Sequence, residues 1–64
     1  MDDAERLARF DAFASDVRDE LARTVERMDA LKAAGRVRSA TYRQLFAARI
    51  TLKDIDRRLQ ERGL

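Results

Sequence analysis

Cysteine, histidine, proline and tryptophan are absent from this 64-residue sequence, and glycine occurs only twice. Without cysteine the chain cannot form a disulfide, and without cysteine or histidine it lacks the usual ligands of structural metal sites. A chain this short buries only about 60% of the surface that it exposes when unfolded, so small proteins commonly need a disulfide, a metal or another subunit. Association with another chain is the support that this composition leaves.

Long apolar runs are also missing. No stretch approaches the roughly 18 apolar residues of a membrane-spanning helix, and the N-terminus begins Met1, Asp2, Asp3, where a secretory signal peptide is basic. We therefore expect a cytoplasmic protein that makes no membrane contact. Among the 14 basic residues only Lys32 and Lys53 are lysines, a bias typical of GC-rich bacterial or phage genomes.

The charged residues, 41% of the chain, are unevenly distributed. Residues 1–34 carry six bases and nine acids, a net charge of −3, whereas residues 35–64 carry eight bases and three acids, a net charge of +5. Hydrophobic residues make up a further 45%, which favours amphipathic helices over a disordered segment. The two halves of the chain therefore have opposite net charge.

The first half of the chain has the apolar spacing of a long helix. Apolar or small residues alternate three and four positions apart, which is the heptad pattern of a helix that packs along one seam. The pattern comprises Leu7, Phe10, Ala14, Val17, Leu21, Thr24, Met28 and Leu31. Asp2 or Asp3 can cap the first turn, and Gly35 suits the left-handed position just after the last turn. These features predict a helix over about residues 3–33 and a connection over 34–40.

A second helix is predicted over about residues 41–62. Thr41 followed by Gln44 forms a capping-box pattern, and Ser39 is the competing cap. The seam again alternates three and four positions apart and comprises Leu45, Ala48, Leu52, Ile55 and Leu59. Since a short connection usually makes two helices antiparallel neighbours, we expect layers in which each residue of one seam faces one residue of the other. The expected layers are Met28 with Leu45, Thr24 with Ala48, Leu21 with Leu52, Val17 with Ile55, and Ala14 with Leu59.

The second helix is about nine residues shorter than the first, so its end leaves part of the first seam uncovered. Leu7, Phe10 and Phe13 lie on this uncovered part, and an exposed apolar cluster of this kind is typical of an interface. We therefore predict an all-α antiparallel hairpin, one domain over residues 1–64, that dimerises into a four-helix bundle. The alternative is three helices with a break at Ile50 and Thr51, where Thr51 to Asp54 also resembles a capping box.

A second apolar face is predicted on the second helix. Tyr42, Phe46 and Ile50 recur four positions apart, away from the seam. They could simply broaden the core stripe of a short helix, or they could form a dimer contact or a groove for a protein partner. The sequence leaves both interpretations open.

The basic residues of the second half suggest an alternative function. A nucleic-acid-binding protein could use arginines and lysines of the second helix and the connection on phosphates. The candidate phosphate contacts are Arg36, Arg38, Arg43, Arg49, Lys53 and Arg57. The competing interpretation is that these bases pair with the acidic first helix, and that Asp54 and Arg58 form an ordinary surface pair.

No group of residues points to catalysis. The chain has no histidine or cysteine and no glycine-rich phosphate loop, and Ser15 and Ser39 are explained by an exposed surface and a helix cap. We predict no catalytic residue, metal, cofactor or small-molecule substrate. The expected function is that of a small regulatory or interaction protein that binds other proteins through helix surfaces of a homodimer.

Overall fold

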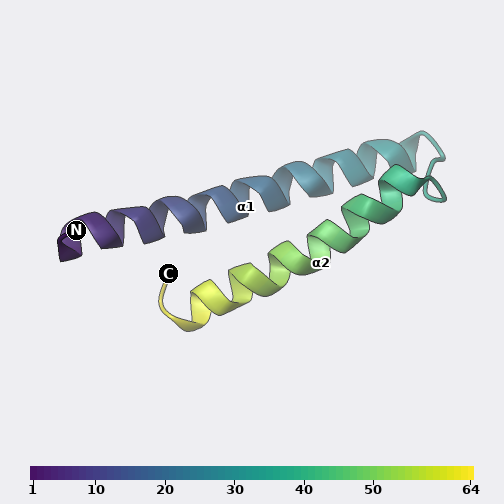
Figure 1. Ribbon diagram of the computed structural model, residues 1–64. Helices are drawn as coiled ribbons and strands as arrows, with labels where there is room; N and C mark the ends of the chain where they lie inside the picture. Colours follow the sequence, from purple (N-terminus) through teal and green to yellow (C-terminus); the bar gives the residue numbers. More distant parts are fainter.

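The protein is a hairpin of two antiparallel α-helices, as the sequence predicts. The computed structural model describes all residues, 1–64, and contains α1 (Asp3–Ala33) and α2 (Ala40–Glu61), with no strand. The two termini lie at one end and the connection at the other (Figure 1). The hairpin is elongated, with dimensions of 49 × 16 × 15 Å.

The two ends of α1 are closed by local hydrogen bonds. The side chain of Asp2 accepts a hydrogen bond from the backbone N–H of Glu5 at 2.7 Å. At the other end Gly35 has φ of 72°, and the N–H of Arg36 donates to the carbonyl of Leu31 at 2.8 Å. This is the Schellman arrangement, which needs a left-handed residue and therefore favours glycine. Gly35 ends the helix and turns the chain back.

The cap of α2 differs from the leading expectation. Ser39, not Thr41, is the N-cap: its Oγ accepts from the N–H of Tyr42 at 3.1 Å and donates to the carbonyl of Arg36 at 2.8 Å. Ser39 is extended, with ψ of 154°, whereas Thr41 already lies within the first helical turn. The helix therefore begins at Ala40. Ser39 is favoured because its hydroxyl satisfies both a helix N–H and a carbonyl of the connection.

The alternative with three helices is wrong. α2 is continuous through Ile50 and Thr51. Leu45, Leu52 and Leu59 are all buried on one stripe that spans this point. A break there would take part of the stripe away from α1, whereas two β-branched residues weaken a helix by only tenths of a kcal/mol each.

The core is a single thin layer between the helices. Its central cluster consists of Ala14, Val17, Leu52 and Leu59, with Leu21, Ile55 and Leu64 packed against it. Only 7 of 64 residues are buried, and the other three are Thr24, Met28 and Leu45. Thr24 satisfies its buried hydroxyl by donating to the carbonyl of Glu20 at 2.8 Å. So thin a core leaves little margin against the conformational entropy of the chain.

Charge pairing between the helices does not follow the interpretation in which bases of the second helix pair with acids of the first. The one ion pair between the helices joins Arg18 of α1 to Asp56 of α2. The expected surface pair of Asp54 with Arg58 is present at 3.1 Å. Net charge does not decide which charged side chains lie beside the seam.

Candidate interaction surfaces

The first candidate site is the overhang surface, formed by Leu7, Phe10 and Phe13 of α1. Their exposed fractions are 55%, 49% and 49%, respectively. They are exposed because α1 has 31 residues and α2 only 22, so that α1 extends about 14 Å further. Leu7 and Phe10 continue the seam that α2 covers from Ala14 onward. The structure thus places the three predicted residues together on an uncovered part of one helix.

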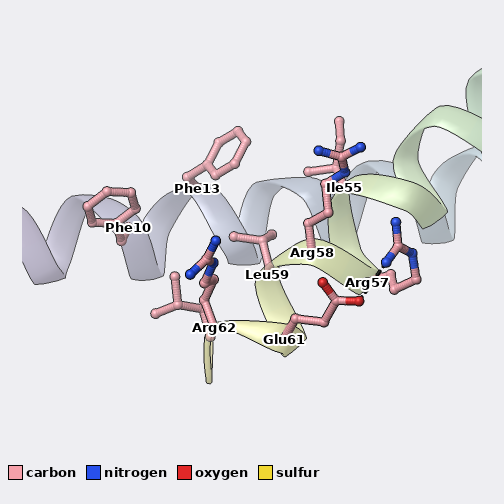
Figure 2. Close-up of a pocket in the computed structure, with 9 residues that line it drawn as sticks. Phe10, Phe13, Ile55, Arg57, Arg58, Leu59, Glu61 and Arg62 are labelled. Atoms are coloured by element: carbon pink, nitrogen blue, oxygen red, sulfur yellow. Dashed lines mark hydrogen bonds and ion pairs between the residues drawn. The ribbon is translucent and has the colours of Figure 1, made fainter.

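The end groove lies between the overhang surface and the last turns of α2 (Figure 2). Its volume is about 430 Å³, and its apolar lining consists of Phe10 and Phe13 of α1 with Ile55, Leu59 and Leu64 from the C-terminal part of the chain. Its remaining lining residues are Arg57, Arg58, Glu61 and Arg62. The groove combines an apolar floor with a mostly basic rim, which suits an amphipathic helix better than a polar small molecule.

Two of the rim arginines are held by carboxylates of α2. Arg57 lies 2.7 Å from Asp54 Oδ1 and 2.5 Å from Glu61 Oε1. The hydrogen bond from Arg57 lowers the pKa of Asp54 from its ordinary value, and the positive charges of Arg58 and Arg57 add to this effect. In turn, the hydrogen bond to Asp54 raises the pKa of Arg57. Arg62, by contrast, forms no ion pair, so its charge faces the groove unneutralised.

The second candidate site is the outer face of α2, formed by Tyr42, Phe46 and Ile50. Tyr42 is half-buried, whereas Phe46 and Ile50 are 44% and 56% exposed. The guanidinium carbon of Arg49 lies 5.0 Å from the centre of the Phe46 ring, within cation–π range. One interpretation was that this face broadens the core stripe. It holds only in part for the half-buried Tyr42, and it does not hold for the exposed Phe46 and Ile50.

The six candidate phosphate contacts do not form one equivalent set. Arg57 is engaged by carboxylates, and Arg49 stacks on Phe46. The remaining four are exposed and form no ion pair with any carboxylate, and they are Arg36, Arg38, Arg43 and Lys53. The neutralisation of Arg57 was visible in the sequence, since Asp54 and Glu61 lie three and four positions away.

The counts over the two halves of the chain did not identify a further feature, the acid-free segment. Residues 30–53 contain no aspartate or glutamate and six bases, which include Lys32 in the last turn of α1. The first turn of α2 carries no acid to offset the positive end of its helix dipole. A count over shorter windows than half of the chain would have shown that the positive charge is concentrated beside the connection.

A further hollow of about 540 Å³ lies beside Thr24 and Ala48, which were predicted to form one small layer. Both residues line it, along with the charged residues Glu20, Arg23 and Arg27. Its lining has no nucleophile paired with a base, and no group of three or more acidic residues in the structure could hold a metal ion. Two small side chains, one from each helix, thus lie beside this hollow.

Neither helix has an apolar stretch of the length that a membrane crossing requires. Comparison of the chain with models of protein families, with curated proteins and with solved structures gives no match.

Proposed function

We propose that this hairpin is a non-enzymatic interaction module that acts through the helix surfaces of an oligomeric bundle. The observation that carries this proposal is the overhang surface, in which Leu7, Phe10 and Phe13 are each about half exposed side by side. Apolar clusters of this kind on small proteins are typical of protein contacts. The outer face of α2 provides a second apolar surface, which is available to a second copy or to a protein partner.

The energy of such an association is comparable with that of the fold. Full burial of a Leu or Phe side chain contributes about 1.5 to 3 kcal/mol, so covering the exposed halves of three such side chains would contribute about 3 kcal/mol. A domain with only 7 buried residues has a small free energy of unfolding. Folding and association should therefore be coupled, with a free energy of unfolding that rises with protein concentration.

Light scattering on the purified chain at micromolar concentration tests the self-association. We expect a mass above the 7.4 kDa of one chain, and a return to 7.4 kDa when Phe10 and Phe13 are both changed to Ser. Ala12→Ser is the matched control, because Ala12 is an exposed residue of the same helix turn. A folded wild-type monomer over the whole concentration range would show that the proposal is wrong.

Nucleic-acid binding is the second candidate function, and one observation favours it: Arg36, Arg38, Arg43 and Lys53 have no carboxylate partner. Four phosphate contacts would make the logarithm of affinity fall with the logarithm of salt concentration with a slope of about −3 to −4. Titration of mixed DNA and RNA oligonucleotides at several salt concentrations measures that slope. Binding that is absent, or that does not respond to salt, would exclude this function.

A further inference from the structure

We infer that the second copy packs antiparallel, with the overhang surface of each chain beside the outer face of α2 of the other. This arrangement rests on the proposed self-association and names its geometry. In this arrangement the second copy covers both apolar surfaces of the chain. The arrangement follows from their charges, their positions along the hairpin and the area that a stable dimer needs.

The two surfaces lie on ends of the hairpin that carry opposite net charge. The end with the overhang surface consists of residues 1–13, with four acids and two bases, and residues 54–64, with three of each, a net charge of −2. The outer face of α2 lies within the acid-free segment, residues 30–53, which has a net charge of +6. Among the bases beside this face, Arg43 and Lys53 have no carboxylate partner within the chain. The end that carries the overhang surface is therefore acidic in total, although the rim of its groove is mostly basic, and the opposite end, residues 14–53, has a net charge of +4.

The two surfaces also lie at opposite ends of the hairpin. The overhang surface is at the end of the termini, and Tyr42, Phe46 and Ile50 lie in the half of α2 next to the connection (Figure 1). In a symmetric dimer, only antiparallel packing places the overhang surface of each chain beside the outer face of α2 of the other chain. A parallel dimer would instead bring two acid-free segments together, each with six bases.

The area of contact favours packing along the full length. A face 49 Å long and 16 Å wide covers roughly 800 Å², which is close to the contribution of one partner to a standard interface. A contact made only between two overhang surfaces, each about 14 Å long, would cover roughly a quarter of that area. An end-to-end dimer of this kind is too small to be stable.

Distances between spin labels across the dimer distinguish these arrangements. The chain has no cysteine, so Ala4→Cys and Ala33→Cys each provide one unique site for a label at an exposed position. The two positions lie about 44 Å apart along α1, because each residue of a helix advances 1.5 Å. Light scattering and circular dichroism of each labelled variant serve as the control that mass and helicity match the unlabelled protein.

For the antiparallel dimer we expect a distance of about 40 Å between two labels at Ala4 and likewise between two labels at Ala33. A mixture of the two labelled variants should then give an additional distance below about 25 Å. In a parallel dimer the distances between two labels at Ala4 and between two labels at Ala33 would both be short, and the distance between Ala4 and Ala33 of different chains would be long. In an end-to-end dimer only the distance between the two Ala4 labels would be short. Either result would overturn the antiparallel arrangement and leave the proposed self-association intact, whereas the absence of any distance between chains would contradict both.

The dependence of dimer affinity on salt provides an independent check. The screening length falls from about 14 Å at 50 mM NaCl to about 4 Å at 500 mM NaCl. Attraction between the acidic overhang segment and the acid-free segment therefore predicts that the dissociation constant of the dimer rises several-fold over this range. Analytical ultracentrifugation measures the dissociation constant. A dimer that becomes tighter over this range would indicate that like charges face each other, as in the parallel arrangement.

Discussion

The Nε atom of Arg18 lies 2.7 Å from Oδ1 of Asp56, in an ion pair that connects the middle of α1 to the last third of α2. The two side chains are 39% and 19% exposed, so the pair is partly shielded from solvent. The second carboxylate oxygen of Asp56 accepts from Nε2 of Gln60 at 2.8 Å, which holds the carboxylate in place. Because no other ion pair joins the helices, this one acts with the apolar layers to fix their register.

Removal of this pair should destabilise the hairpin measurably. A double-mutant cycle with Arg18→Ala and Asp56→Ala should give a coupling energy of about 1 kcal/mol, above the usual value for an exposed pair. The control is the exposed pair of Arg9 with Glu5, at 3.2 Å, for which we expect at most about 0.5 kcal/mol. Urea denaturation at one fixed protein concentration measures both. A coupling energy no larger than that of the control pair would show that the ion pair adds nothing to the register.

The cap of α2 gives a sharper prediction than the sequence allowed. Ser39→Ala should reduce the free energy of unfolding by about 1 kcal/mol, because it leaves the N–H of Tyr42 and the carbonyl of Arg36 without their side-chain partner. Thr41→Ala is the matched control, since Thr41 lies inside the helix, where alanine is at least as favourable. Thermal denaturation followed by circular dichroism measures both variants. A larger loss from Thr41→Ala than from Ser39→Ala would mean that the capping box forms after all.

Leu52 is the side chain of α2 whose truncation should cost most. It is 7% exposed and packs in the central cluster with Ala14, Val17 and Leu59. Leu52→Ala should cost about 2 to 5 kcal/mol, enough to unfold so small a domain at 25 °C. The adjacent Thr51→Ala, at an exposed position, should stay within about 0.5 kcal/mol of wild type. If Leu52→Ala keeps full helicity and cooperative unfolding, the thin core is not the main source of stability.

The helical hairpin could be predicted from the sequence because few signals compete in it. The alternation of three and four positions has no other periodic explanation, and Gly35 is the one residue between the seams that strongly favours the end of a helix. The uncovered side chains of Leu7, Phe10 and Phe13 followed from the difference in helix length alone, and the structure finds them about half exposed.

The details that the sequence did not decide depend on side-chain geometry. Ser39 and Thr41 both have a hydroxyl that can cap, and only the backbone conformation selects between them. The pairing of Arg18 with Asp56 depends on which charged side chains flank the seam after packing, which a count of charges cannot show. The stacking of Arg49 on Phe46 competes with its use as a phosphate contact, and the outcome depends on rotamers.

The pKa of Asp54 predicts a response of the end of α2 to acid. The hydrogen bond from Arg57, together with the positive charge of Arg58, holds the pKa of the folded state below the ordinary value of 3.8. A carboxyl with a lowered pKa stabilises the folded state at a pH above its unfolded-state pKa, and this contribution is lost as the pH falls through the lower folded-state value. The last turns of α2, which carry Arg57 and Arg58, should therefore loosen in that acidic range and remain intact at neutral pH.

Carbon-13 NMR of the carboxyl group between pH 2 and 6 should give a midpoint below 3.8 for Asp54 and a higher midpoint in Arg57→Gln. Arg62→Gln is the matched control because Arg62 forms no hydrogen bond to Asp54, and its midpoint should equal that of wild type. A midpoint that does not rise in Arg57→Gln would show that Arg57 is not the cause of the low pKa.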